Sequence, residues 1–159
     1  MSQARASQSV QAPPDRVFAI VADIPNAAGR IRAIEGIEVL AEAPAAPGNL
    51  GPVGRGFRWR ETRTMFGKKA TEDMTVTEWE PPRRYAVEAR SHGCHYRSAV
   101  IVEPDGPDAC TLTMTFDATP ETAGAKVMMK VFFFMRGQIE KALRTDLQDI
   151  KALAESPAA

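Results

Sequence analysis

The segment from Phe57 to Met65 carries the residues whose types and spacing best suit chemistry in an apolar site. Alternation in a strand places Trp59, Glu61 and Arg63 on one face of this segment. If that face looks inward, the two charged side chains enter an apolar interior, where charges are stable only when paired. A desolvated carboxylate of this kind suits an acid or a base acting on a bound ketone. Glu61 and Arg63 are therefore the candidate catalytic residues.

Several arrangements of this pair remain open. The two side chains can pair with each other, or with Glu72 or Asp73 on the next strand of a predicted hairpin. Both can instead reach solvent at a frayed strand end. A one-residue bulge would also reverse the two faces of the strand, so the face that points into a cavity stays undetermined.

Tyr85 and Tyr96 lie on adjacent predicted strands. Each can place its hydroxyl at the wall of a cavity, where it would hold a ligand carbonyl. The alternative is that each is a core tyrosine with only its hydroxyl at the rim.

His92, Cys94, His95 and Cys110 are the only imidazole and thiol side chains of the chain. Their spacing differs from that of common zinc sites, and alternation points His95 away from Cys94. The glycine-rich run from residue 51 to residue 56 precedes a strand rather than a helix, so it does not match a phosphate-binding loop. We therefore expect no metal and no cofactor.

Alternation and turn residues predict an antiparallel sheet that positions these side chains. The last strand is the clearest, because apolar residues at every second position from Cys110 to Ala118 alternate with threonine and aspartate. Two short helices are expected after the first strand, one beginning near Pro13 and ended by Pro25, the other spanning Ala27 to Ile34. The predicted strands are 4–12, 37–43, 57–65, 70–79, 85–91, 96–102 and 110–118.

After Pro120 the apolar period changes to three or four residues, which predicts one long helix that stops near Ser156 and Pro157. This helix is the only element large enough to cover the apolar face of the sheet. From residue 127 to residue 135 it is apolar on nearly all sides, broken only by Lys130. The surplus apolar side chains must be covered by loops, a ligand, a partner or a membrane surface.

Motifs spread along the chain carry a resemblance to a known family. They are Ala12-Pro13 with Val17-Phe18 and Asp23, the glycine-led strand from Gly54 to Trp59, the run Trp79-Glu80-Pro81-Pro82-Arg83, the segment from Glu103 to Thr115, and the closing helix. With these the chain resembles the START-like superfamily, also called the SRPBCC or birch-allergen-like helix-grip fold, and within it the polyketide cyclase/dehydrase and lipid transport type. The resemblance implies an α+β fold in which a curved antiparallel sheet wraps around a long C-terminal helix, with a deep cavity between them.

The resemblance also implies a function, since relatives use this cavity for lipids, hormones and polyketides, and some catalyse cyclisation or dehydration. We expect binding, for transport or sensing, of a bulky hydrophobic small molecule. The alternatives are a cyclase or dehydratase that uses Glu61 or Arg63 with a tyrosine hydroxyl, and a protein- or membrane-interaction module. The expected ligand-binding residues are Phe57, Trp59, Met74, Tyr85, Tyr96, Met114, Phe116, Met128, Phe132 and Met135.

The length and the charge of the chain limit the number of domains and the kinds of partner that we expect. The 159 residues fit a single domain over positions 1–159. The 20 basic and 20 acidic residues cancel, which argues against a nucleic-acid partner and against a broad electrostatic footprint for an anionic membrane, although a local patch stays open. The first ten residues are not those of a secretory signal and no apolar run is long enough to span a bilayer, so we expect a cytoplasmic protein. Peripheral membrane contact and a homodimer stay open.

Overall fold

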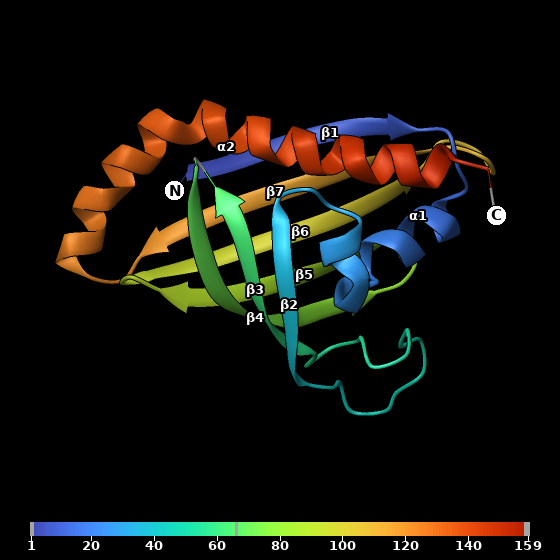
Figure 1. The fold of residues 1–159 in the computed structure, drawn as a ribbon, viewed down its shortest axis with the longest axis horizontal. Helices are drawn as coiled ribbons and strands as arrows, with labels where there is room; N and C mark the ends of the chain where they lie inside the picture. Colours follow the sequence, from blue (N-terminus) through green and yellow to red (C-terminus); the bar gives the residue numbers. More distant parts are fainter. Residues whose placement is uncertain (1, 66, 158–159) are drawn as a thin grey trace.

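Seven antiparallel strands form one curved sheet in the computed structural model, which describes residues 2–65 and 67–157 (Figure 1). The strand order across the sheet is β1-β7-β6-β5-β4-β3-β2, so β1 and β2 are its two edges and the sheet stays open. The strands are β1 (Ser2–Val10), β2 (Ile34–Ala41), β3 (Arg58–Met65), β4 (Lys68–Glu80), β5 (Arg84–Ser91), β6 (Cys94–Pro104) and β7 (Cys110–Pro120). The predicted fold class is confirmed, and the strands differ from the predicted ranges only at their ends.

The helices of the described residues are two short ones after β1 and one long one after β7. They are α1 (Pro14–Val21), the 3-10 helix η1 (Ile24–Gly29) and α2 (Ala123–Glu155). The Thr122 side chain caps α2 by accepting a hydrogen bond of 3.1 Å from the backbone N–H of Ala125. The helix ends at Glu155, because Pro157 cannot continue it. Figure 1 shows α2 lying along β1, with its first turns bent around the far end of the sheet.

The predicted second short helix is present, but its predicted bounds, Ala27 to Ile34, are wrong. The structure has instead η1, which includes Pro25, and a strand that already begins at Ile34. Proline is tolerated in the first turn of a helix, where its missing N–H has no intrahelical partner, so Pro25 begins η1 rather than ending α1. Ile34 is buried and pairs with Arg63 of β3, which holds it in the sheet.

The packed core fills only the end of the sheet that faces α1 and the C-terminal half of α2. Phe18 of α1 packs edge-on against Tyr85, with ring centroids 6.1 Å apart, and the Tyr85 hydroxyl donates a 2.7 Å hydrogen bond to the Val21 carbonyl. Leu147 and Ile150 of α2 are buried in the same cluster. The first half of α2 makes no comparable core, and the space between it and the sheet holds the candidate site.

Candidate functional site

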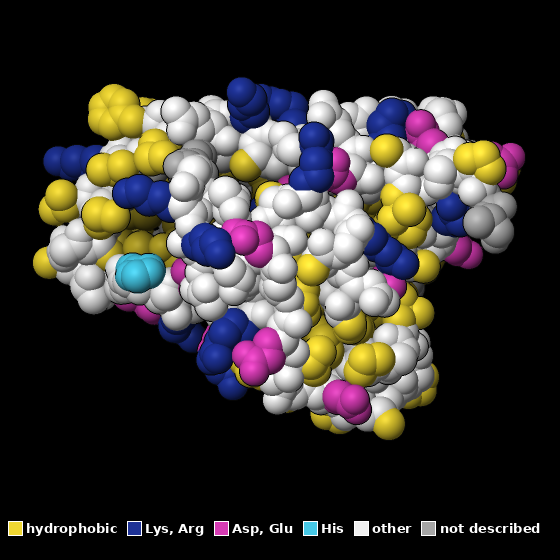
Figure 2. Space-filling model, viewed as in Figure 1, with side chains coloured by type: hydrophobic (Ala, Val, Ile, Leu, Met, Phe, Trp, Pro, Cys, Tyr) yellow, Lys and Arg dark blue, Asp and Glu magenta, His cyan; other side chains and the backbone are white. Residues whose placement is uncertain are grey.

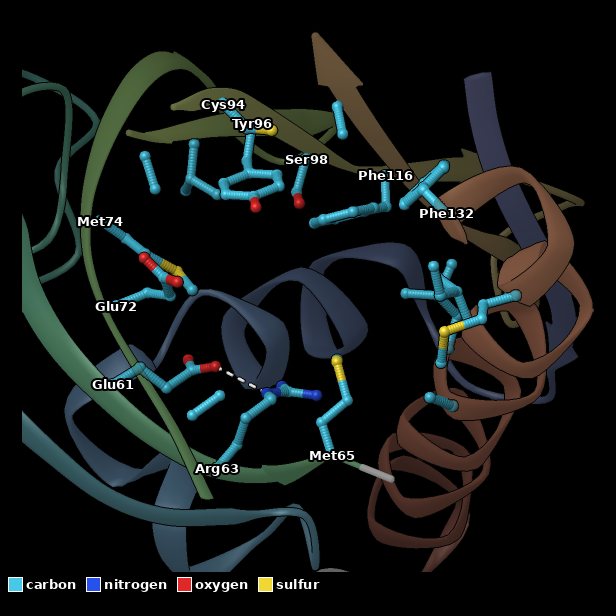
Figure 3. Close-up of a pocket in the computed structure, with 18 of the residues that line it drawn as sticks. Glu61, Arg63, Met65, Glu72, Met74, Cys94, Tyr96, Ser98, Phe116 and Phe132 are labelled. Carbon is cyan, nitrogen blue, oxygen red and sulfur yellow. Dashed lines mark hydrogen bonds and ion pairs between the residues drawn. The ribbon is translucent and has the colours of Figure 1, made fainter. Parts of the chain in front are cut away.

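A cavity of about 370 Å³ lies between the concave face of the sheet and the first half of α2 (Figure 3). Its volume falls within the range of small-molecule pockets, roughly 300–1,000 Å³. The lining side chains are mostly apolar. They come from β3 to β7 and α2 and include Met65, Ala70, Met74, Val87, Ala89, Cys94, Tyr96, Ser98, Phe116, Ala118, Met128, Met129, Val131, Phe132, Met135, Ile139, Ala142 and Leu143.

An aromatic stack joins the sheet to the helix on one wall of the cavity. Phe116 of β7 lies between Tyr96 of β6 and Phe132 of α2, with ring centroids 5.6 Å and 5.8 Å apart. Alternation along β6 turns Tyr96 and Ser98 to the same face, and Figure 3 shows both side chains directed into the cavity. Three elements distant in sequence therefore make one apolar surface.

A buried ion cluster forms the opposite wall. Arg63 Nε lies 2.9 Å from Glu61 Oε2, and Arg63 Nη1 lies 3.1 Å from Oδ2 of Asp146, which belongs to α2. The side chain of Glu61 is 9% exposed and that of Asp146 6% exposed. Glu61 Oε1 also accepts a 3.4 Å hydrogen bond from the Trp59 indole N–H. The strand face that carries Trp59 therefore points inward.

The cluster holds one positive and two negative groups. Burial alone would lower the pKa of Arg63, but the carboxylates of Glu61 and Asp146 outweigh it and raise that pKa, so Arg63 stays charged. Burial raises the pKa of Asp146, and the nearby Arg63 offsets this only in part. Asp146 Oδ1 is buried and has no hydrogen-bond partner among the described residues. The cluster therefore places two buried acidic side chains around a single guanidinium.

Polar groups from β4 and β6 also face the cavity. Glu72 lies directly opposite Glu61 in the β3–β4 register, and its Oε1 accepts a 2.8 Å hydrogen bond from the Ser91 hydroxyl. Burial, the Cys94 thiol and the Glu72 carboxylate together raise the pKa of Tyr96 to about 12. At neutral pH the Tyr96 hydroxyl therefore remains protonated and can donate a hydrogen bond into the cavity.

The sequence-predicted site residues fall into two groups. Both catalytic candidates, Glu61 and Arg63, line the cavity and pair with each other. The ligand-binding candidates that line it are Met74, Tyr96, Phe116, Met128, Phe132 and Met135. Those that belong to the packed core or pack against it instead are Phe57, Trp59, Tyr85 and Met114. These four are packed in the core because α1, together with the C-terminal half of α2, covers their end of the concave face of the sheet.

Asp146 and Ser98 were not predicted. A signal for Asp146 was present, since it follows Leu143 by three positions and Ile139 by seven and so interrupts the apolar stripe of the helix. Such an acid on a core stripe indicates a buried partner of opposite charge. Ser98 offers no comparable signal, because a small residue on a strand fits a filled core as well as a cavity wall.

The residues weighed as metal ligands lie apart. His95 Nε2 is 2.7 Å from Glu88 Oε1, whereas Cys94, one position before it, is buried and lines the cavity. Cys110 is buried in the core, and His92 lies in the turn between β5 and β6. Within residues 2–65 and 67–157, no three His, Cys, Asp or Glu side chains form a group that would hold a metal ion.

Comparison with known proteins gives a family and several similar folds. The family model described as polyketide cyclase / dehydrase and lipid transport matches residues 1–155. An aromatase/cyclase, ZhuI, from Streptomyces sp. R1128 is 18% identical, with a TM-score of 0.76 over 97% of this chain and 93% of that chain. A START superfamily protein from Mycobacterium smegmatis is 15% identical, with a TM-score of 0.73 over 96% of this chain and 97% of the other.

A third similar structure is norcoclaurine synthase from Thalictrum flavum, 13% identical, with a TM-score of 0.69 over 96% of this chain and 93% of that chain. At these identities the structures show a shared fold. No protein with a curated function matches the sequence. Within the described part of the chain, no helix is both long and apolar enough to cross a membrane.

Proposed function

Because the chain belongs to the polyketide cyclase/dehydrase and lipid transport family, we propose that it binds a bulky, mainly apolar small molecule in the cavity under α2. The observation that carries this proposal is the cavity of about 370 Å³, lined by methionine and aromatic side chains. Methionine makes an adaptable apolar wall. Burying a ligand there gains about 25 cal/mol per Å² of apolar surface, before ordering costs.

The charged wall restricts the polar end of this ligand. Glu61 and Glu72 line the cavity, and a single guanidinium, that of Arg63, is shared by Glu61 and by Asp146 behind it. Arg63 already donates hydrogen bonds to two of these carboxylates, so it is not a free anion-binding group. A ligand carboxylate or phosphate would meet acidic side chains and no unpaired cation among the described lining residues, whereas a hydroxyl or an amine could donate to Glu72. The ligand therefore ends in a neutral or cationic hydrogen-bond donor.

Uptake of an environment-sensitive dye tests the binding, and competition tests the class of ligand. Naphthylethanol and naphthylethylamine should displace the dye, and naphthylacetate should do so at least about tenfold more weakly, a difference of about 1.4 kcal/mol. Native mass spectrometry of the purified protein would identify a retained ligand directly. An absence of dye uptake would reject the binding function, and equal displacement by all three probes would reject the proposed polar end.

A cyclase or dehydratase reaction in the same cavity is the second candidate function. Its support is the pair of Glu72 and Tyr96, which face the cavity as a carboxylate and a protonated hydroxyl. Glu72 could take a proton from the carbon between two carbonyls, while Tyr96 donates to the ketone oxygen that becomes negative. Glu61 is less suited, because both of its oxygens accept hydrogen bonds from Trp59 and Arg63.

Turnover of a synthetic polyketone would test this reaction. Glu72→Gln should lower turnover at least about a hundredfold while dye uptake is retained, since general acid–base catalysis typically contributes 10²–10⁴-fold. Glu103→Gln is the matched control, because Glu103 is an exposed carboxylate of β6 that does not line the cavity. Equal turnover by wild type and both variants would remove Glu72 from any catalytic role.

A further inference from the structure

The outward face of the first half of α2 is apolar and exposed. Phe134 is 85% exposed, Val127 66% and Phe133 63%. The rings of Phe133 and Phe134 lie edge to face, with centroids 6.1 Å apart. Figure 2 shows hydrophobic side chains gathered at the end of the molecule where this part of α2 lies in Figure 1. Such a group of large apolar side chains on one surface marks an interaction site.

The same stretch of helix is basic. Lys126, Lys130 and Arg136 are exposed, and no acidic residue lies between Glu121 and Glu140. Neither lysine has an ion-pair partner among the residues that the structure describes, and Arg136 lies 3.8 Å from Glu140 only at the end of the stretch. The chain as a whole has no net charge, so this is a local excess of positive charge.

Helical geometry places the lysines and the exposed aromatic residues together. At 3.6 residues per turn, Lys126, Lys130 and Phe133 follow one another at spacings of four and three positions, on one face of α2. Val127 and Phe134 are seven positions apart on the adjoining stripe. The opposite face carries Phe132, which lines the cavity. We call residues 126–136 the basic apolar segment.

We propose that the basic apolar segment docks on the surface of an anionic lipid bilayer. Phenylalanine and valine side chains would enter the boundary between headgroups and acyl chains, while the lysine stems extend along it and carry their ammonium groups to lipid phosphates. A second copy of this chain fits less well, because a two-fold interface here would bring the lysines and Arg136 of both copies together.

The docking would bring the cavity close to the bilayer. Val131 both lines the cavity and is 48% exposed, and Met128 also lines it and is 59% exposed. A bilayer in contact with these side chains would cover the part of the cavity wall that water now reaches. The two lysines, Phe133 and Phe134 do not line the cavity, so docking does not depend on ligand uptake.

Co-sedimentation with vesicles tests the proposal. The full chain should bind vesicles of equal parts phosphatidylcholine and phosphatidylglycerol, and bind phosphatidylcholine alone much more weakly. Lys126→Gln with Lys130→Gln should weaken anionic binding by roughly fivefold for each lysine. Phe133→Ser with Phe134→Ser should weaken binding to the mixed vesicles at least about tenfold.

Matched controls lie elsewhere on the surface. Lys68→Gln with Lys69→Gln removes two exposed lysines of β4, and Val39→Ser removes a side chain of β2 that is 44% exposed. Both controls should bind vesicles like the wild type.

Absence of binding to the mixed vesicles, or equal effects of segment and control variants, would overturn the proposal. The proposal would also be overturned if light scattering showed a dimer, the phenylalanine variants were monomeric, and the wild type did not bind vesicles. Dye uptake without vesicle binding would reject only the docking, and vesicle binding without dye uptake would reject only the ligand function.

Discussion

Arg63→Met should lower the free energy of unfolding by about 3–5 kcal/mol at neutral pH, because it leaves two buried carboxylates without their shared cation. Glu61 and Asp146 are each less than a tenth exposed at the side chain, and Arg63 is the only cationic partner that the structure gives them. Urea unfolding followed by far-UV circular dichroism would measure the loss. The expected loss is large because removal of one member of a buried ion cluster exposes the others to an uncompensated desolvation penalty.

The loss should depend on pH in a direction set by Asp146. Burial raises the pKa of this carboxyl, and Arg63 is the group that lowers it, so the variant should have a still higher value. A group whose pKa is raised on folding contributes stability below its unfolded pKa of about 4 and loses that contribution as pH rises through the folded pKa. The difference between Arg63→Met and wild type should therefore be largest at neutral pH and shrink as pH falls toward about 4.

Two controls separate this effect from a general loss of strand packing. Arg60→Met changes the same type of residue on the outer face of β3, where Arg60 Nε lies 2.7 Å from Asp73 Oδ1 in an exposed pair. Its effect should be much smaller, since exposed ion pairs contribute little. Replacing Glu61, Arg63 and Asp146 together by Leu, Met and Leu should recover most of the lost stability. A stable, pH-independent Arg63→Met protein would contradict the assigned role of the cluster.

Alternation along the strands predicted which face of the sheet is apolar, but not how far along each strand the core extends. Trp59 and Met74 illustrate the limit, because they lie directly opposite each other on β3 and β4. Trp59 is nevertheless in the packed core, whereas Met74 lines the cavity. Likewise Tyr85 bonds to α1, and Val87, the next inward residue of β5, faces the cavity. The boundary is set by where α1 packs on the curved sheet, which period-two spacing does not encode.

The long helix shows what spacing alone does predict. The change to a three- or four-residue period after Pro120 identified α2, and the surplus of apolar residues from Val127 onward is the exposed stretch of the structure. Of the two partners of Arg63, Glu61 was among the predicted alternatives, whereas Asp146 was not, because the other predicted alternatives, Glu72 and Asp73, belong to the neighbouring strand. Asp146 lies 83 positions away and reaches Arg63 only through the packing of α2 on the sheet.

Ser98→Trp should lower the affinity of the cavity for the dye at least about tenfold, which is a loss of about 1.4 kcal/mol in binding free energy. Ser98 lies directly opposite Val87 on one side and Phe116 on the other, and both neighbours line the cavity. Figure 3 shows its side chain directed into the open space. An indole at this position would fill volume that a ligand needs, whereas the same change in a filled core would cause strain. Isothermal titration with the dye would measure the loss, and circular dichroism would show that the fold is kept.

Arg97→Trp is the matched control, because it adds an indole one position earlier on β6, and alternation turns that side chain to the opposite face of the sheet. Its dye affinity should stay within about twofold of the wild type. The Ser98→Trp protein should still bind anionic vesicles, since Phe133 and Phe134 of the basic apolar segment remain exposed. Undiminished dye uptake in Ser98→Trp would place the dye outside the cavity, with the exposed phenylalanines as the next site to test. Loss of uptake with vesicle binding retained would separate the two surfaces of α2, one facing a ligand and the other facing lipid.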